Sequence, residues 1–424
     1  MVHQEVTPAD IERLAAGLWE DRRGLIACGQ PDIQKRAVSA LARMATRWRD
    51  PEYHVRRKAE RENAGFPFSM IWQSLNPLLD SFSEEALWKL IESESARDIQ
   101  GAVLIGHVIA ANTPLLAWTS VARALLVQSA SLVKLPSHPI AAWAEYFHAS
   151  LREADNDLAN LVCLCRWKGG EEALDEALCR SCDLIVAYGS DETIFALEKL
   201  CRPGSLLDYG HRLSFGIVTT GADWNAAARG FAKDTLLYDQ GGCLSPHCLF
   251  VEGDAQNAAS FAGLLAQALA EACRDGEFVD QGLCEDRQRS ATVREERALA
   301  QMESGTCLWT DMDLLWTVIA VSNTGFRASR THGIVYVIPF LGRYLNDALA
   351  GVRARMQGVG IASANDIEWE EWQTRLKDFG VNYFCFPGKM QCPGLAWRQN
   401  GKDVLDSLVG RGQTIGYKKE EKTS

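Results

Sequence analysis

The 424-residue sequence lacks several features that mark specialised classes of protein. It has no low-complexity tract and no internal repeat, so its composition is that of a globular protein. Basic residues are also in deficit: 44 lysines and arginines stand against 55 acidic residues, and the formal net charge is −11. Because affinity for a phosphate backbone comes from clustered basic residues, this balance argues against nucleic acid as a partner.

Long apolar runs are missing as well. The most apolar region covers residues 101–133 and is interrupted by His107, Asn112, Pro114 and Arg123. It therefore lacks the roughly twenty apolar residues that a membrane span needs, and the amino-terminal residues lack the apolar core of a signal peptide. Thirteen cysteines, an odd number, fit reduced thiols better than a disulfide framework. We expect a cytoplasmic protein without a membrane span.

The length predicts two large domains, because one core rarely serves more than about 250–300 residues. Residues 1–100 are predicted to form a helical amino-terminal region that packs on the next domain. From residue 101 short buried strands alternate with helices, which indicates parallel sheets and doubly wound α/β domains. We expect a dinucleotide-binding domain over residues 101–222, a second α/β domain over 223–410, and a solvated tail over 411–424.

Individual elements are expected as follows. In the first α/β domain the strands are 102–105, 131–134, 160–165, 183–188 and 215–218, and the helices are 114–129, 171–178 and 191–200. In the second the helices are 224–237, 254–274 and 345–356, and the strands are 248–252, 334–338 and 358–361. The residues expected to cap helices are Ser83 and Asp223. Residues 276–330 show no pattern that places an element.

Residues 239–248 read Asp-Gln-Gly-Gly-Cys-Leu-Ser-Pro-His-Cys, which places Cys243 in a glycine-bounded turn ahead of a buried strand. Such a turn can hold a thiolate next to a substrate carbonyl. A buried structural thiol is the alternative, and a metal site with His247 and Cys248 lacks a second ligand pair at suitable spacing. Four other cysteines fit a core better than a zinc cage: Cys163, Cys165, Cys179 and Cys182. No metal site is expected.

Four segments, taken in order, resemble the aldehyde dehydrogenase superfamily. Residues 112–114 read Asn-Thr-Pro and residues 134–137 read Lys-Leu-Pro-Ser, similar to its Asn-x-Pro and Lys-Pro-Ser motifs with one leucine inserted. Residues 187–190 resemble its Gly-Ser turn at a helix start, and residues 240–243 resemble its nucleophile loop. The resemblance implies an aldehyde dehydrogenase-like fold of two doubly wound α/β domains with a helical amino-terminal region.

The resemblance narrows to the LuxC-like acyl-CoA reductase branch of this superfamily. It is carried by Tyr-Gly-His-Arg-Leu-Ser-Phe-Gly at residues 209–216, by residues 239–246, and by the carboxy-terminal stretch 386–401. The best-known members supply long-chain aldehyde to bacterial luciferase. The similarity extends from about residue 65 to residue 410, and it makes residues 223–410 the expected catalytic domain.

The resemblance implies a reaction in which Cys243 attacks an acyl thioester of CoA or of a carrier protein. The thiol leaves, the acyl group stays on the cysteine, and hydride from a nicotinamide gives a thiohemiacetal that collapses to aldehyde. The Asn112 side-chain amide and the Cys243 backbone N–H would donate to the oxyanion. The alternative for Asn112 is a turn or cap before Pro114.

The cofactor residues are also implied by the resemblance. Gly189 and Ser190 would let a helix N-terminus approach the cofactor pyrophosphate, while Lys134 and Ser137 would meet the adenosine ribose. A lysine there tolerates a 2′-phosphate, so NADPH is expected, with NADH as the alternative. The plain structural interpretations are a strand-to-helix turn and a solvated lysine at a strand end.

Residues 207–214 lack the glutamate base that the hydrolytic aldehyde dehydrogenases carry. Its absence favours reduction of a thioester, because a water-activating base would hydrolyse the acyl-enzyme. His211 lies in this segment and could act as acid or base. Other interpretations stay open: the reverse reaction toward acyl-CoA, an acyltransferase or thioesterase without hydride transfer, and a non-catalytic subunit. An acyl-transferring partner protein and a homo-oligomer are also expected.

Overall fold

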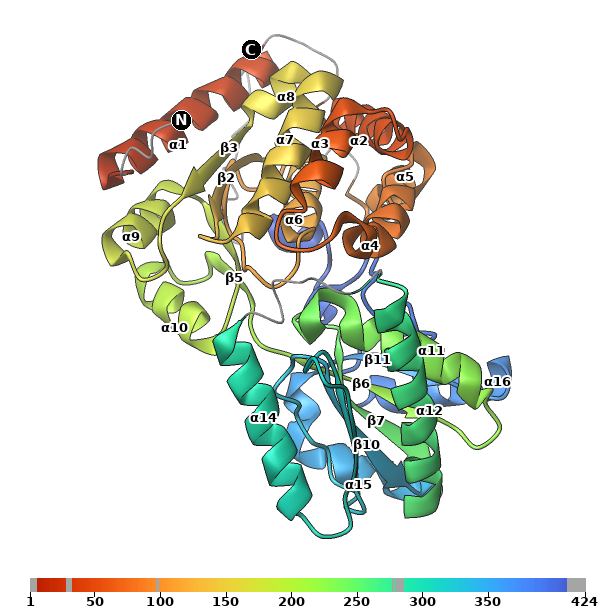
Figure 1. Ribbon diagram of the computed structural model, residues 1–424. Helices are drawn as coiled ribbons and strands as arrows, with labels where there is room; N and C mark the ends of the chain where they lie inside the picture. Colours follow the sequence, from red (N-terminus) through yellow and green to blue (C-terminus); the bar gives the residue numbers. More distant parts are fainter. Residues whose placement is uncertain (1–5, 28–32, 97–98, 277, 279–285, 410–424) are drawn as a thin grey trace.

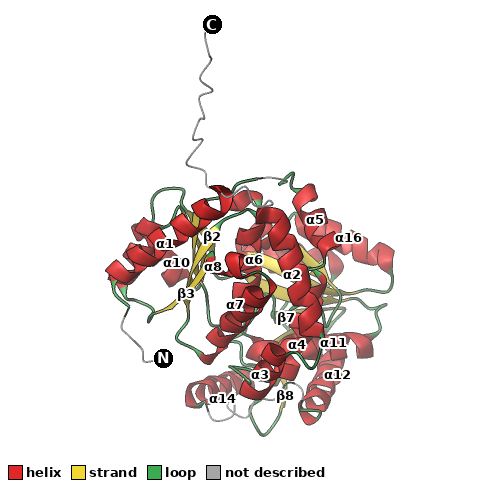
Figure 2. Cartoon of the chain, turned by 90° about the horizontal axis from the view of Figure 1, so that it is seen from above, coloured by secondary structure: helices red, strands yellow, loops and turns green. Residues whose placement is uncertain are grey.

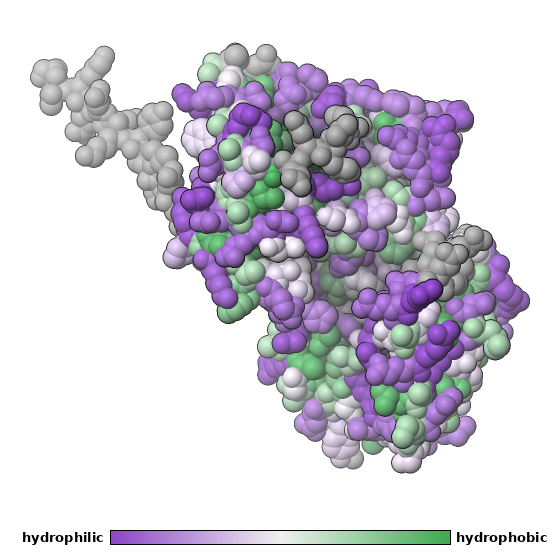
Figure 3. Space-filling view, turned by 60° about the vertical axis from the view of Figure 1, so that its left-hand side comes forward, coloured by the Kyte–Doolittle hydropathy of each residue, from purple (hydrophilic) through white to green (hydrophobic). Residues whose placement is uncertain are grey.

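The computed structural model describes residues 6–27, 33–96, 99–276, 278 and 286–409, so the expected tail over 411–424 lies outside the described residues. Figures 1 and 2 show two α/β units, each a twisted sheet flanked by helices. The face in Figure 3 is mainly hydrophilic, with apolar residues scattered over it. None of the helices in the described ranges is long and apolar enough to cross a bilayer.

In the described part of the chain, five helices precede the first strand. Their bounds are α1 (Pro8–Ala27), α2 (Ile33–Arg49), α3 (His54–Glu62), α4 (Phe68–Asp80) and α5 (Glu84–Ser93). Ser83 caps α5, as expected, by accepting the Ala86 N–H at 3.3 Å. These helices pack on the first sheet's own helices through Trp48, which is fully buried and donates to the Ser150 hydroxyl at 2.9 Å.

The first sheet has five parallel strands in the order β3-β2-β1-β4-β5. The strands are β1 (Leu104–Val108), β2 (Ala130–Leu135), β3 (Val162–Arg166), β4 (Leu184–Tyr188) and β5 (Leu206–Tyr209). The connecting helices are α6 (Leu116–Leu126), α7 (Ala142–Ala154), α8 (Asn156–Asn160), α9 (Glu172–Ser181) and α10 (Asp191–Leu200). The strand order reverses between β1 and β4, which is where ligands bind in open α/β sheets.

The second sheet has seven strands in the order β12-β11-β6-β7-β10-β9-β8, and only β8 runs antiparallel to its neighbour. The strands are β6 (Leu213–Val218), β7 (Pro246–Glu252), β8 (Cys307–Thr310), β9 (Thr317–Ala320), β10 (Ile334–Phe340), β11 (Met356–Ala362) and β12 (Tyr383–Cys385). One face packs on α11 (Trp224–Leu236) and α12 (Ala255–Arg274). The other packs on α14 (Arg287–Met302), α15 (Leu345–Leu349) and α16 (Asp366–Lys377).

The structure differs from the sequence expectations at several places, and it contains five elements that the sequence did not predict: α7, α8, β5, α16 and β12. The expected strand 215–218 was assigned to the first α/β unit, but β6 pairs with β7 and β11 of the second sheet. The expected helix 345–356 is short, because a 3-10 turn follows α15. The unplaced segment 276–330 contains α14, β8 and β9, whose packing on the sheet compensates for weak local patterning.

Candidate active site

Cys243 lies in a short loop, residues 241–245, which we call the Cys243 loop. It follows a 3-10 turn, η2 (Leu237–Gln240), and leads into β7. Ser214 ties this loop to the second sheet. Its hydroxyl donates to the Cys243 carbonyl at 2.9 Å and accepts the Gly358 N–H at 3.1 Å. The carbonyl of the cysteine is therefore held by Ser214 of β6, which is itself fixed by β11, and Cys243 is one of the residues that line the cavity described below.

The turn before the loop has an unusual backbone conformation. Tyr238, Asp239 and Gln240 have φ angles of 57°, 51° and 61°. A residue with a β-carbon adopts such angles at a cost of about 1–3 kcal/mol, and such residues gather at functional sites. The Tyr238 hydroxyl donates to Ser74 of α4 at 2.7 Å, which anchors the turn to the amino-terminal helices.

The Cys243 side chain is half-buried, and its sulfur accepts a hydrogen bond from Gln357 Nε2 at 3.5 Å. Burial raises the pKa of the Cys243 thiol to about 11, and hydrogen bonds from its own backbone N–H and from Gln357 offset this only in part. The thiolate is the nucleophile. In the free protein at neutral pH, Cys243 is therefore present mainly as the thiol.

This pKa predicts how the free protein reacts with iodoacetamide. Alkylation of Cys243 should accelerate about tenfold per pH unit between pH 7 and pH 10, because the thiolate fraction rises in that proportion below the pKa. Mass spectrometry of the Cys243 peptide measures the rate, and the peptide of the exposed Cys307 reports reagent decay. A plateau near pH 8 would contradict the raised pKa.

Asn112, in the connection after β1, lies against the Cys243 loop although it is far away in sequence. Its Nδ2 donates to the Gly241 carbonyl at 3.1 Å. The structure therefore brings together two of the residues that the sequence singled out, one from each α/β unit. An asparagine amide together with the backbone N–H of a nucleophile is the type of donor pair that stabilises an oxyanion. That role for Asn112 stays a prediction.

His211 is exposed in the connection between β5 and β6. Its backbone N–H donates to Asp191 Oδ1 at 3.2 Å, and its ring centroid lies 6.2 Å from that of His247. His247 is buried, and burial, with the nearby His211, lowers its pKa to about 4. Within the described ranges no hydrogen bond or ion pair joins His211 to Cys243. Its role as acid or base remains a prediction without a contact to support it.

Gly189 and Ser190 form the turn between β4 and α10. A β-carbon on Gly189 would lie 3.0 Å from the Thr193 side chain, and Ser190 Oγ accepts the Thr193 N–H at 3.4 Å. The N–H groups that open a helix suit a phosphate, whereas Asp191 and Glu192 in the first turn disfavour an anion. The backbone of this turn fits a cofactor pyrophosphate, and the two carboxylates limit how close it can approach.

Lys134 forms an ion pair within the protein. Its Nζ lies 2.9 Å from Asp175 Oδ1 on α9, and the same oxygen accepts the Trp167 Nε1–H at 2.8 Å. The Lys134 and Asp175 side chains are only 10% and 13% exposed. This lysine reaches a ribose or a 2′-phosphate only by leaving its carboxylate partner. Ser137 is exposed in the loop beyond β2, where contact with a ribose stays a prediction.

A cavity of about 90 Å³ adjoins Cys243. Its apolar lining comes mainly from Leu78, Leu115, Leu116, Leu244 and Trp397, and the hydroxyl and amide groups on its wall come from Ser74, Thr113, Thr119, Gln391 and Gln399. Ligand pockets usually measure about 300–1,000 Å³. A ligand of the usual size therefore needs the walls of this cavity to move apart.

One wall of the cavity is the carboxy-terminal segment that follows β12. Asp234 of α11 is fully buried and accepts the N–H groups of Gly388 and Met390 at 2.6 and 3.0 Å. Burial raises the pKa of Asp234 to about 7, because desolvation outweighs these two hydrogen bonds. Gln391 follows directly and donates to the Ser245 hydroxyl at 2.7 Å. Asp234 thus anchors the wall that covers the Cys243 loop.

Several residues of the site have no signal in the sequence. Gln357 reaches Cys243 from β11, and no motif marks it. Gly242 is an exception, because a second glycine before Cys243 indicates in the sequence that a side chain packs closely on the loop. In the structure a β-carbon on Gly242 would lie 2.4 Å from Gln391 Oε1. Within the described ranges, no group of three or more histidine, cysteine or acidic residues is arranged to hold a metal ion.

The family model described as acyl-CoA reductase (LuxC) matches residues 31–411. A long-chain acyl-protein thioester reductase of Aliivibrio fischeri is 30% identical over 151 residues, covering 35% of this chain and 32% of the relative. One of Photorhabdus laumondii subsp. laumondii is 25% identical over 239 residues, covering 51% and 50%. The chain thus spans half or less of these relatives.

Solved structures show the same fold. An NAD-dependent benzaldehyde dehydrogenase of Corynebacterium glutamicum superposes with a TM-score of 0.65 at 16% identity, covering 91% of this chain and 88% of the other. A glyceraldehyde-3-phosphate dehydrogenase of Methanocaldococcus jannaschii, complexed with NADP, gives 0.66 at 14% identity, covering 91% and 86%. The fold is therefore aldehyde dehydrogenase-like, as predicted. The family match extends over most of the sequence, and the chain belongs to the LuxC acyl-CoA reductase family.

Proposed function

We propose that this protein reduces an acyl thioester to an aldehyde by way of an acyl group bound to Cys243. The observation that carries the proposal is the contact between Asn112 and the Cys243 loop beside a largely apolar cavity. In this contact the Asn112 amide of the first unit donates to the carbonyl of Gly241, two residues before Cys243. Family membership and the names of the relatives support the same reaction class.

In the first step Cys243 Sγ attacks the thioester carbonyl carbon, and the bond from that carbon to the sulfur of CoA or of a carrier protein breaks. The departing thiolate takes a proton, and the cysteine keeps the acyl group. The Asn112 amide and the Cys243 backbone N–H donate to the oxygen of the tetrahedral intermediate. Because the pKa of Cys243 is raised, forming its thiolate at neutral pH adds to the free-energy barrier of this step.

The second step needs a hydride, which a bound nicotinamide cofactor supplies. The residues that would hold such a cofactor are those at the strand ends of the first sheet, with Gly189 and Ser190 at its pyrophosphate. Reduction of the acyl carbon followed by loss of the cysteine thiol gives the aldehyde. NADPH was expected from Lys134, but this residue is paired with Asp175. The preference for NADPH over NADH therefore stays a prediction.

The acidic residue in segment 207–214 is poorly suited to serve as a hydrolytic base. Asp208 lies in the segment where a hydrolytic enzyme carries its base, yet its carboxylate is bound to Lys402 Nζ at 2.9 Å. The Lys402 ammonium contributes to holding the pKa of Asp208 below its ordinary value, despite desolvation in the opposite direction. A carboxylate that is paired in this way is a weak base for activating water.

The proposal is tested with purified full-length protein, fatty acyl-CoA thioesters of several chain lengths, and either NADPH or NADH. We expect thioester-dependent oxidation of the cofactor with one aldehyde formed for each cofactor oxidised. Free fatty acid without cofactor oxidation would indicate a thioesterase, and acyl esters of an added alcohol would indicate an acyltransferase. The identity of the acyl donor, an acyl-transferring partner protein and a homo-oligomeric state are further proposals.

A further inference from the structure

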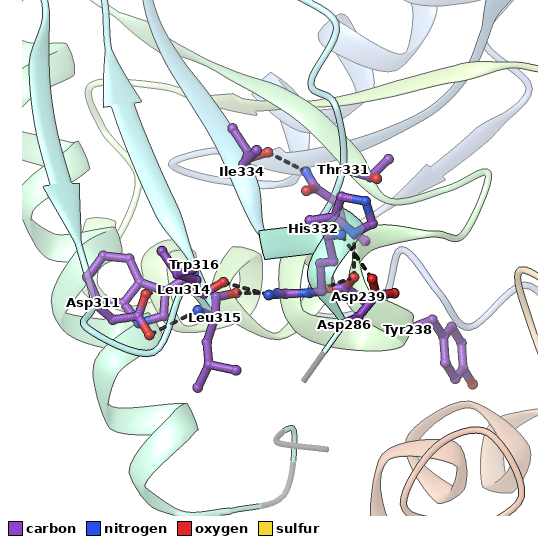
Figure 4. Close-up of polar contacts among 12 residues, drawn as sticks. Tyr238, Asp239, Asp286, Asp311, Leu314, Leu315, Trp316, Thr331, His332 and Ile334 are labelled. Atoms are coloured by element: carbon purple, nitrogen blue, oxygen red, sulfur yellow. Dashed lines mark hydrogen bonds and ion pairs between the residues drawn. The ribbon is translucent and has the colours of Figure 1, made fainter. Parts of the chain in front are cut away.

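Asp239 is the centre of a partly buried polar cluster directly upstream of the Cys243 loop (Figure 4). Arg289 Nε lies 3.0 Å from both carboxylate oxygens, and its Nη2 lies 2.9 Å from Oδ1. His332 approaches the same carboxylate, with Nδ1 2.6 Å from Oδ2. We name Arg289, Asp239 and His332 the clamp. Figure 4 shows His332 and Asp239 turned toward each other, while the Tyr238 ring points away from them.

The clamp joins two segments that both have left-handed backbone. One is the turn 238–240 before the Cys243 loop, and the other is the turn 331–333 before β10, with φ angles of 66°, 59° and 73°. The His332 N–H also donates to the Asp239 carbonyl at 3.1 Å, and Gln240 Nε2 donates to the Ile334 carbonyl at 2.7 Å. Strained turns persist only where surrounding contacts hold them, and here each turn holds the other.

Arg289 makes this arrangement rigid. It lies in the first turn of α14, is 1% exposed at its side chain, and donates through Nη1 to the Leu314 carbonyl at 2.7 Å. A buried guanidinium that is bound to a carboxylate in a forked geometry has little freedom to move. Helix α14, the connection between β8 and β9, and the turn at Asp239 are therefore fixed to one another.

The clamp is connected to the reacting groups through a few residues of backbone. Gly241, whose carbonyl accepts the Asn112 amide, is two residues from Asp239, and Cys243 is two residues further on. We propose that the clamp residues are positioning residues, which hold the strained turn so that Cys243 and Asn112 meet an acyl thioester in reactive geometry. This inference rests on the proposed function. None of the three residues lines the cavity beside Cys243.

The chain supplies a matched control on the same helix. Arg297 of α14 forms an ion pair with Asp311 at 3.0 Å, with side chains 14% and 15% exposed, and donates to the Trp316 carbonyl at 2.8 Å. It is thus a second largely buried arginine bound to a carboxylate and to backbone carbonyls. Its partners lie around β8 and β9 and not in the Cys243 loop, so its replacement should affect stability without moving the nucleophile.

The test compares D239N, R289K and R297K with the wild-type full-length protein. Two rates of Cys243 are measured in each folded variant: acylation by a fatty acyl-CoA in a single turnover, and alkylation by iodoacetamide. We expect D239N and R289K to acylate about 10- to 100-fold more slowly, because a displacement of about 1 Å has effects of that size. Alkylation has no strict geometric demand, so it should be unchanged or faster. R297K should acylate within about threefold of wild type.

Acylation of D239N at the wild-type rate would overturn the proposal, and so would equal losses in R289K and R297K. If D239N does not fold, H332Q replaces it in the test. This variant keeps the ion pair between Arg289 and Asp239 and removes only the contact of the His332 ring with Asp239. It should acylate about tenfold more slowly than wild type, and an unchanged rate would overturn the proposal. Failure of wild-type Cys243 to take up any acyl label would contradict the proposed function itself, which is a separate outcome.

Discussion

Replacement of Cys243 by alanine is expected to lower kcat/KM for thioester reduction by at least about 10⁴-fold, because losing the nucleophile removes the whole covalent route. Acyl label should no longer be retained by the protein. The fold should persist, since Cys243 is half-buried in a loop that is held by Ser214 on the Cys243 carbonyl and by Gln391 on the Ser245 hydroxyl. Steady-state assays and acyl-label retention measure the two effects.

The matched control for this variant is Cys248→Ala. Cys248 lies five residues further along, fully buried in β7, and is the other cysteine of the same segment. Its replacement should leave acyl retention in place, with a change in activity of no more than about threefold. If Cys243→Ala retains label or Cys248→Ala loses it, the assignment of the nucleophile is wrong.

Asn112→Ala carries the second largest expected effect. Loss of one oxyanion donor lowers kcat by about 10²–10³-fold, equivalent to about 3–4 kcal/mol of transition-state stabilisation. The KM for the thioester should change little, because the donor acts mainly on charge that develops in the transition state. Asn112→Asp, which keeps the shape but presents a negative charge, should be at least as slow. Steady-state kinetics with a fixed thioester measure both variants.

The structural alternative for Asn112 predicts a different set of results. If its amide served only to hold the Gly241 carbonyl, Asn112→Ala would loosen the loop, and iodoacetamide would reach Cys243 faster while kcat fell only slightly. The oxyanion role predicts the opposite combination, in which alkylation is close to wild type and kcat falls steeply. Measuring both quantities on one preparation separates the two interpretations.

Local signals in the sequence predicted much of the first α/β unit. Helix α10 has the predicted bounds, because Ser190 is a good cap and acidic residues open the helix. Asp223 caps α11 for the same reason, accepting the Ala226 N–H at 3.0 Å. The meeting of Asn112 and the Cys243 loop was implied by the family resemblance and not by any local pattern.

The parts that were missed depend on contacts between distant residues. The expected helix over 224–237 ends one residue early, and three non-glycine residues then adopt left-handed angles that no sequence rule indicates. The contacts of this turn come from Arg289 and His332, which are 50 and 93 residues from Asp239. Both partners lie beyond residue 276, in or next to the segment that showed no clear pattern. Likewise β6 joins the second sheet because β7 and β11 pair with it, which a strand pattern alone cannot show.

The central claim is that Cys243 carries the acyl group that is reduced. The most direct measurement loads the wild-type protein with a labelled fatty acyl-CoA without cofactor, removes excess donor, maps the label to a peptide, and then adds NADPH. We predict label on the Cys243 peptide and its release as aldehyde, one for each cofactor oxidised. Label on another residue, or its release as free fatty acid without cofactor oxidation, would contradict the account.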